Sequence, residues 1–473
     1  MKILFGIIFF ISLCSFFNRV IAENDKSRCT LEDQIAVEVT VYNDNIGLIK
    51  DIRKIDLPVD EGELQFMDVA SHIMPETVHV RSINNPGGLT VYEQNYEYDL
   101  MSAEKLLDKY VGKKVKIMVT NEYHDRKEVI DATLLSNNDG QIYKIQEEIF
   151  LGHPGIKVLP GIPENLVSQP TLTWLYANRN EAYHNLEVSY LTSNINWKAD
   201  YVMVLNGDDT LSDISGWVTL DNKSGTTYRK AKLKLIAGDI HRTEVRGKEM
   251  LLSASAVKMV ADSQFEEKPF FAYHIYDLQR KTSIKDKQTK QINLLEANGV
   301  KIRKEFIVRG TKRYYTANYS EQLTKEDVHV YIYCRNTKEN NLGMPLPAGI
   351  MRLYKQDDEE SLQFIGEDRI NHIPKDEEME LKVGNAYDIV AERRQTDYKQ
   401  ITTKLYESEW EIVLRNHKEG TVTVGIIESL SGNWSMVKNS HPYKKEDAFT
   451  VRFDVEVPGG GETRVAYRIK VGL

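Results

Sequence analysis

Apolar and polar residues alternate along much of the chain with a period of two. Three clear runs cover residues 35–41, 449–457 and 465–471, where Val, Ile, Phe or Tyr occupies every other position. Successive side chains of a strand point to opposite faces, so each run buries one face and exposes the other. The pattern favours antiparallel sheets over the continuously apolar strands of a doubly wound fold.

Short turn motifs separate these apolar runs. They contain Asn, Asp and Gly, the residues that tolerate the positive φ of tight hairpins, and they occupy residues 86–88, 137–140, 206–209 and 221–225. Many short strands with frequent turns predict sandwiches or barrels. We therefore expect an all-β fold of several antiparallel β-sandwich domains with few helices.

Helical periodicity is scarce. The best example is Ser102–Val111, where Ser102 can cap the N-terminus and Leu106, Leu107 and Tyr110 recur at helical spacing. A weaker helical pattern covers Glu244–Asp262, which is rich in Ala, Ser, Met and Lys. We interpret this second segment as a connecting helix or a mobile insertion.

These patterns divide the chain into five parts. The expected parts are a signal peptide (1–22), an N-terminal β region (23–100), a helix with a small SH3-like or Sm-like barrel (101–160), a central β-sandwich region with an insertion near 242–265 (161–400), and an immunoglobulin-like C-terminal sandwich (401–473). Trp410 and Trp434 are expected as core aromatic residues of the last part.

The N-terminus has the pattern of a secretory signal peptide. Lys2 precedes the apolar run Ile3–Phe17, and the small residues Val20 and Ala22 precede the expected cleavage point. The alternative is an uncleaved membrane anchor, but the run is shorter than the roughly 20 residues that a spanning helix needs. We therefore expect a periplasmic or secreted protein that is cleaved near Ala22 and has no integral membrane span afterwards.

Two cysteines, Cys29 and Cys334, remain after cleavage. Export permits a disulfide between them. The alternative is two buried thiols, which the alternation in the apolar strand around Cys334 favours, because Cys334 shares a face with Val330 and Ile332. Since the sequence has no CxxC, we expect neither a zinc ribbon nor thioredoxin-like chemistry.

Charge and motifs narrow the function classes. The 473 residues carry 61 basic and 70 acidic side chains, a net charge of −9, which argues against nucleic acid as a partner. The sequence contains no GxSxG, HExxH or phosphate-binding GxxxxGK[ST] motif, and its eleven histidines are scattered singly. We therefore expect no catalytic residues, no metal site and no cofactor.

Four residues are candidate ligand contacts. Trp197 and Tyr201 can stack on a sugar ring or a peptide if exposed, or form part of a sheet core if buried. Arg393 and Arg394 can bind an anionic group, since Arg suits carboxylate and phosphate, or protect an edge strand from aggregation. The sequence favours the structural interpretation in both cases.

Seven short segments combine aromatic, Gly and Asp residues in a distinctive order. They are Val188–Thr192, Trp197–Tyr201, Gly216–Gly225, Ala231–Asp239, Tyr273–Leu278, Leu346–Gly349 and Gly384–Asp388. Together they resemble the domain-of-unknown-function 4139 family of exported proteins, over residues 35–473. The resemblance implies an all-β, extracytoplasmic protein, but no activity is assigned to the family and no catalytic residue is implied.

Two hypotheses for function follow. The first is an exported, non-enzymatic β-sandwich protein that binds or scaffolds an envelope component, such as a glycan, or a protein partner. The second is an exported hydrolase in which an Asp/Glu pair acts on a glycan-like substrate, with the two carboxylates about 5–10 Å apart in a cleft.

Overall fold

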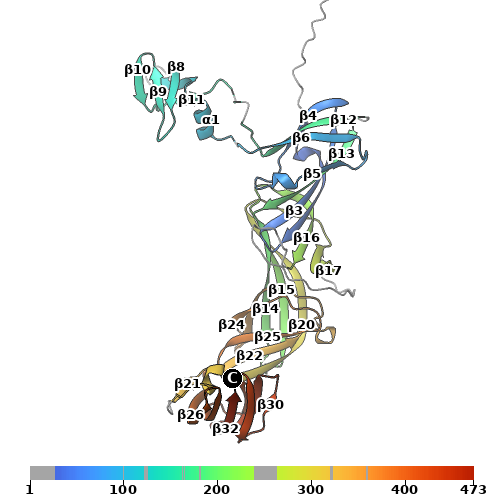
Figure 1. Cartoon of the computed structure of the whole chain (residues 1–473). Helices are drawn as coiled ribbons and strands as arrows, with labels where there is room; N and C mark the ends of the chain where they lie inside the picture. The colour runs from blue at the N-terminus through green and yellow to red at the C-terminus, as the bar shows by residue number, and fades with distance from the viewer. Residues whose placement is uncertain are drawn as a thin grey trace, which may run out of the picture. The chain divides into compact units, whose positions relative to one another are not determined.

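A computed structural model describes residues 27–99, 101–121, 126–161, 163, 166–179, 183–238, 264–319, 323–357, 359 and 361–472. The predicted signal peptide and the segment Glu244–Asp262 lie outside the described residues. The described part is built from strands, with a single α-helix, which confirms the all-β class (Figure 1). The described residues form two compact units: those within 27–37, 49–192 and 224–226, and those within 38–48, 193–223 and 227–472.

A four-stranded sheet forms one part of the first unit. Its strands, in spatial order, are β1 (Ser27–Cys29), β4 (Asp60–Met67), β12 (Thr171–Asn178) and β6 (Leu89–Glu97). Leu64 lies opposite Trp174 in the β4–β12 ladder. Phe66, two residues further along β4, packs on Trp174 with ring centroids 5.3 Å apart. All three side chains are buried, as the period-two pattern requires.

A buried ion pair supports this sheet. Arg53, on β3 (Ile46–Asp56), binds Asp51 at 2.8 Å, and its guanidinium lies 3.8 Å from the ring centroid of Phe66. Arg53 also donates to the carbonyl oxygens of Cys29 and Met67. It therefore ties β1, β3 and β4 together.

The remaining elements of the first unit are either short or contribute residues to the second unit as well. The strand β13 (Tyr183–Ser193) pairs antiparallel with β5 (His79–Ser82). Two 3₁₀ turns, η1 (Leu31–Asp33) and η2 (Pro75–Thr77), belong to the same unit. The strands β2 (Gln34–Tyr42) and β3 contribute residues to both units.

The predicted helix and small β domain are present within the first unit. Helix α1 (Ala103–Lys109) starts at Ser102, whose side chain accepts a hydrogen bond from the Lys105 amide, as expected for a cap. The sheet beside it contains, in spatial order, β10 (Glu148–Leu151), β9 (Ile142–Ile145), β8 (Arg126–Ser136), β7 (Lys114–Asn121) and β11 (Ile156–Val158). The strands at its two edges are β10 and β11, so the structure differs from a closed barrel. Within the described residues, no helix is both long and apolar enough to cross a membrane.

The second unit is organised around a large sheet. Along its main path lie β24 (Leu362–Ile370), β23 (Gly349–Gln356), β14 (Ile195–Leu205), β15 (Leu211–Asn222), β20 (Gln288–Arg309), β28 (Val422–Ser429), β31 (Thr450–Val457) and β30 (Lys444–Lys445). Off this path, β22 (His329–Arg335) pairs with both β20 and β25 (Glu378–Asn385). The 22-residue strand β20 pairs with β15 over its first half and with β22 and β28 over its second half.

Four further strands of this unit belong to another sheet. The strand β16 (Tyr228–Ala237) pairs antiparallel with β18 (Tyr273–Leu278) and with β19 (Thr282–Ile284), and β18 pairs with β17 (Phe265–Phe270). Residues 38–42 of β2 pair with β16 in parallel.

The C-terminal sandwich packs a second sheet against β28 and β31. That sheet contains β21 (Thr324–Glu326), β26 (Ile389–Thr402), β27 (Leu405–Asn416), β32 (Glu462–Gly472) and β29 (Asn433–Asn439), with the 3₁₀ turns η3 (Lys312–Tyr315) and η4 (Lys338–Asn340) elsewhere in the unit. Trp410, Phe453 and Tyr467 are buried in its core, as expected for Trp410, whereas Trp434 is half-buried at the edge. The core also contains Val308, which lies on β20.

Two details differ from the sequence-based expectations. The expected boundary at residues 400 and 401 falls inside β26, because the sandwich core recruits strands that precede it in the chain. The sheets are also not purely antiparallel, since β14 pairs with β23 and β20 pairs with β28 in parallel. Long crossover connections make such pairs possible, and periodicity alone does not report strand direction.

The two cysteines are free thiols and both are buried. Burial raises the pKa of Cys29 to about 12, although the neighbouring Arg53 opposes the shift. Burial likewise raises the pKa of Cys334 to about 12. The structure therefore supports the buried-thiol interpretation rather than the disulfide.

We predict that neither thiol reacts with iodoacetamide in the native protein near pH 8, because only the thiolate is nucleophilic and burial disfavours it. In guanidinium chloride both Cys29 and Cys334 should be alkylated, as measured by peptide mass spectrometry. Recovery of a Cys29–Cys334 linked peptide under non-reducing conditions would contradict this prediction.

Candidate functional site

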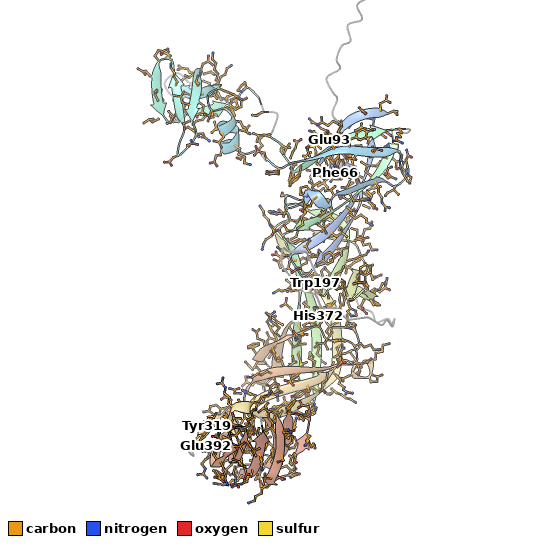
Figure 2. The ribbon with its side chains drawn as sticks, viewed as in Figure 1. Phe66, Glu93, Trp197, Tyr319, His372 and Glu392 are labelled. Carbon is orange, nitrogen blue, oxygen red and sulfur yellow. The ribbon has the colours of Figure 1, made fainter. Side chains whose placement is uncertain are left out.

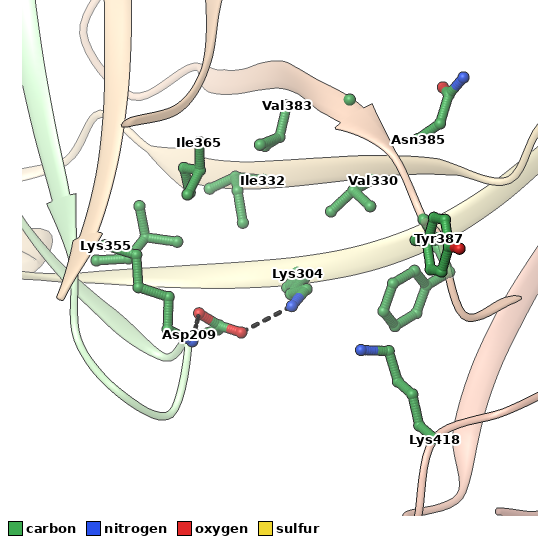
Figure 3. Close-up of a pocket in the computed structure, with 14 residues that line it drawn as sticks. Asp209, Lys304, Val330, Ile332, Lys355, Ile365, Val383, Asn385, Tyr387 and Lys418 are labelled. Atoms are coloured by element: carbon green, nitrogen blue, oxygen red, sulfur yellow. Dashed lines mark hydrogen bonds and ion pairs between the residues drawn. The ribbon is translucent and has the colours of Figure 1, made fainter. Parts of the chain in front are cut away.

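A pocket in the second unit is the best-formed candidate site. It has a volume of about 240 Å³, and we call it the lysine-rimmed pocket (Figure 3). Its lining comprises Leu205, Asp209, Lys304, Phe306, Val330, Ile332, Lys355, Ile365, Val383, Gly384, Asn385, Ala386, Tyr387 and Lys418. Most of the uncharged lining side chains are aliphatic or aromatic, Asn385 adds an amide, and the charged groups come from three lysines and one aspartate.

Strand alternation explains how apolar walls and charged groups reach the same pocket. On β20, Lys304 and Phe306 are two residues apart and point to the same face, while Glu305 points to the other face and binds Arg452 at 2.9 Å. On β22, Val330 and Ile332 face the pocket in the same manner. Because side chains alternate between the two faces of a strand, only one face of each of these strands lines the pocket.

A close approach of β24 and β25 forms another wall. A Cβ atom on Gly366 would collide with the carbonyl oxygen of Val383, and Gly366 has a φ of +154°. The Lys382 amide donates to the Asp368 carboxylate at 2.7 Å, which joins the two strands without a regular ladder. Glycine at position 366 thus allows Ile365 and Val383 to lie in the same wall.

A shared carboxylate holds two of the lysines. Asp209 accepts from Lys304 at 2.7 Å and from Lys355 at 2.6 Å, and Figure 3 shows both contacts at the side of the pocket. Both lysine side chains keep about one-third of their surface, 31%, exposed to solvent. Lys418 stands apart from this group, 3.7 Å from Asp388.

The ion pairs keep Asp209 charged. Burial raises the pKa of Asp209, but the hydrogen bonds and charges of Lys304 and Lys355 outweigh burial, so the pKa lies below its ordinary value. A carboxyl group with a lowered pKa is a poor general acid at neutral pH, since it gives up its proton before the reaction begins. This arrangement suits binding better than proton transfer.

A second cavity is lined by other residues of β20 and β22. It has a volume of about 340 Å³, and its charged lining residues are Lys301, Arg303, Arg335, Glu339 and Glu378. The pKa of Glu339 is lowered by hydrogen bonds from its own backbone amide and from Thr337. Glu378 lies 3.6 Å from Arg303. Glu339 therefore has the opposite of the raised pKa that a glycosidase acid requires.

Trp197 and Tyr201 are in the core rather than at a surface. Both lie on β14 with almost no exposure, 1% and 0%, and Figure 2 labels Trp197. The Trp197 indole donates to the carbonyl of Ile236, and the Tyr201 hydroxyl donates to the carbonyl of Pro347. The ligand-contact interpretation is therefore wrong for both residues in this structure, since a period-two position on a covered sheet face is inaccessible. Asp200, the neighbour of Tyr201 on β14, is also largely covered.

Arg393 belongs to a buried ionic cluster. Its guanidinium donates to Glu326 at 2.6 Å, to Glu428 at 2.7 Å and to the hydroxyl of Tyr467 at 3.0 Å. The Tyr315 hydroxyl donates to the other oxygen of Glu428 at 2.5 Å. With only 1% of its side chain exposed, Arg393 cannot meet an external anion, so the ligand-contact alternative is wrong for this candidate residue.

Arg394 points to the opposite face of β26. Its side chain is 43% exposed and pairs with Glu411 at 2.8 Å. It therefore remains accessible but already has an anionic partner, in agreement with a charged strand surface. The side chains of Arg393 and Arg394 therefore lie on opposite faces of β26. Trp197 and Tyr201 lie on a different strand, β14, so the four candidate residues do not form one site.

The sequence signals for the pocket were present but dispersed. Residues 384–387 line it and belong to the Gly384–Asp388 segment, and Asp209 ends the turn motif at residues 206–209. The three lysines come from β20, β23 and a loop between β27 and β28, and no spacing rule connects them. Models of known protein families and curated protein sequences contain no match to this chain.

We predict that Arg393→Met destabilises the protein by about 3–5 kcal/mol, because it leaves Glu428 buried without its cation. The adjacent substitution Arg394→Met is the matched control and should cost about 1 kcal/mol or less, since its ion pair is partly exposed. Urea unfolding followed by tryptophan fluorescence measures both. Equal effects of the two substitutions would show that burial of the Arg393 cluster has no special importance.

Proposed function

We propose that this protein is a non-enzymatic binding protein that holds a small molecule, or a group on a larger partner, in the lysine-rimmed pocket. The observation that supports the proposal is the composition of the pocket. Apolar side chains form much of its lining, three lysines supply positive charge, and its single lining carboxylate, Asp209, is already paired with two of them. Pockets with apolar walls and a few placed polar groups are typical ligand sites.

The hydrolase hypothesis has less support. A hydrolase of glycans needs two carboxylates that flank the scissile bond, one of them with a raised pKa. The lysine-rimmed pocket contains one carboxylate, and its pKa is lowered. The charge arrangement therefore favours retention of a bound molecule over its cleavage.

The location of the protein is part of the proposal. The pattern of Met1–Ala22 predicts export, and the resemblance to the domain-of-unknown-function 4139 family also implies an extracytoplasmic protein. A binding protein outside the cytoplasm would meet envelope components and the surfaces of other exported proteins. We propose that its partner is drawn from these molecules.

We predict that Val383→Trp abolishes binding, because the larger side chain occupies the pocket from the wall on β25. Native mass spectrometry of the protein purified from its own host should detect a non-covalent adduct on the wild type and none on Val383→Trp. The control is Val383→Ala, which enlarges the pocket and should retain the adduct.

The same preparations provide a test for catalysis. Glycan and ester substrates should remain intact on incubation with the wild-type protein. Turnover that a single carboxylate or histidine substitution abolishes would overturn the binding proposal in favour of a hydrolase.

A further inference from the structure

We infer that the lysine-rimmed pocket binds an amphipathic anion, with an apolar body in the pocket and a carboxylate or phosphate head at the lysines. This inference rests on the proposed function and adds the chemical class of the molecule. It is argued from the size of the pocket, the chemistry of its walls and the balance of charge at its rim.

The volume limits the apolar body. A cavity of roughly 150 Å³ lined by Leu, Ile and Phe holds a benzene ring. The lysine-rimmed pocket, at about 240 Å³, therefore has room for a medium-length alkyl chain or a fused pair of rings. It is too small to enclose a whole membrane lipid or an oligosaccharide, since sites for drug-sized molecules occupy roughly 300–1,000 Å³.

The walls favour hydrocarbon over sugar. Val330, Ile332, Ile365 and Val383 have no side-chain donor or acceptor, and they lie next to one another in Figure 3. A hydroxyl group buried against such walls loses its hydrogen bonds to water without replacement, at a cost of about 1–3 kcal/mol each. The glycan partner that the sequence left open is therefore a poor occupant of this pocket.

The charged groups favour an anion. Three lysines face one lining carboxylate, so the lining carries two net positive charges; Asp388, beside Lys418, offsets one of them at the rim. Lys304 and Lys355 approach the pocket from the side, next to the apolar walls, as Figure 3 shows. An anionic head placed there would receive hydrogen bonds from ammonium groups, which are about twice as strong as neutral ones.

Lysine also limits the specificity for the head group. An ammonium group is a compact charge without the fork geometry by which arginine recognises carboxylate or phosphate in two-point contact. Because the lining contains no arginine, we expect it to accept both head groups. The apolar body then decides which molecules bind.

Asp209 competes with the bound anion. It occupies the ammonium groups of Lys304 and Lys355, so an incoming head must share them or displace Asp209. Removal of this charge should therefore strengthen binding of an anion. Asparagine is a suitable replacement because Asp209 has a φ of +55°, a conformation that Asn also adopts readily.

Isothermal titration of the full chain with ten-carbon probes, below their micelle concentrations, tests the inference. Decanoate and decyl phosphate should bind, and comparison of the two shows which head group is preferred. Decanol has the same chain without the charge and should bind at least about tenfold more weakly. Decyltrimethylammonium and acetate, which lack the negative head and the chain respectively, should show no binding.

Three substitutions connect the result to the pocket. Asp209→Asn should tighten decanoate binding by about 3–10-fold, and Lys418→Gln should weaken it by about 2–5-fold, as expected for partly exposed charges. Lys382→Gln removes an exposed lysine of β25 that does not line the pocket, and it should change nothing. Circular dichroism and thermal unfolding verify that each variant is folded.

Two outcomes would overturn the inference. Equal affinity for decanoate and decanol would show that the pocket ignores charge, and weaker binding by folded Asp209→Asn would show that Asp209 supports the head group instead of competing with it. Either result leaves the proposed function intact, provided that Val383→Trp still loses its adduct. If Val383→Trp keeps the adduct of the purified wild type, the proposed function itself fails.

Discussion

The second unit depends on one continuous strand that pairs with three other strands. Over its 22 residues, β20 pairs first with β15 and then with β22 and β28. Backbone hydrogen bonds on both edges fix the strand, so the side chains that it presents are held in defined directions. Lys304 and Phe306 line the pocket, and Val308, on the same face, enters the core of the C-terminal sandwich. The pocket is therefore connected through β20 to the core of the C-terminal sandwich.

The ionic clusters at Arg393 and at Asp209 have similar chemistry but differ in burial. Arg393 and Asp209 each contact two oppositely charged side chains, but Arg393 is inside the sandwich core, whereas the lysines at Asp209 are one-third exposed. Removal of a partner from a buried cluster leaves an unsolvated charge, so such a cluster serves structure. Exposed ammonium groups can exchange one anion for another at small cost, so they are available to a bound molecule.

The arrangement of charges also bears on catalysis. Ammonium groups beside Asp209 stabilise its ionised form, and hydrogen bonds do the same for Glu339 in the second cavity. Acid catalysis by a carboxyl group requires the opposite environment, in which burial or a like charge retains the proton. In both cavities the protein has carboxylates in environments that favour a permanent charge, which is the condition for electrostatic recognition.

The sequence by itself determined the class of fold and most of its strands. Alternation in residues 449–457 and 465–471 predicted β31 and β32, and Ser102 predicted the start of α1, because these signals depend on neighbouring residues. Only the tertiary structure decided which faces are covered. Ile35, on the apolar face of its run, is 55% exposed near the start of β2, whereas Arg393 is buried. The pocket also required the folded chain, because Asp209, Lys304, Lys355 and Lys418 are distant in sequence and meet only through long-range strand pairing.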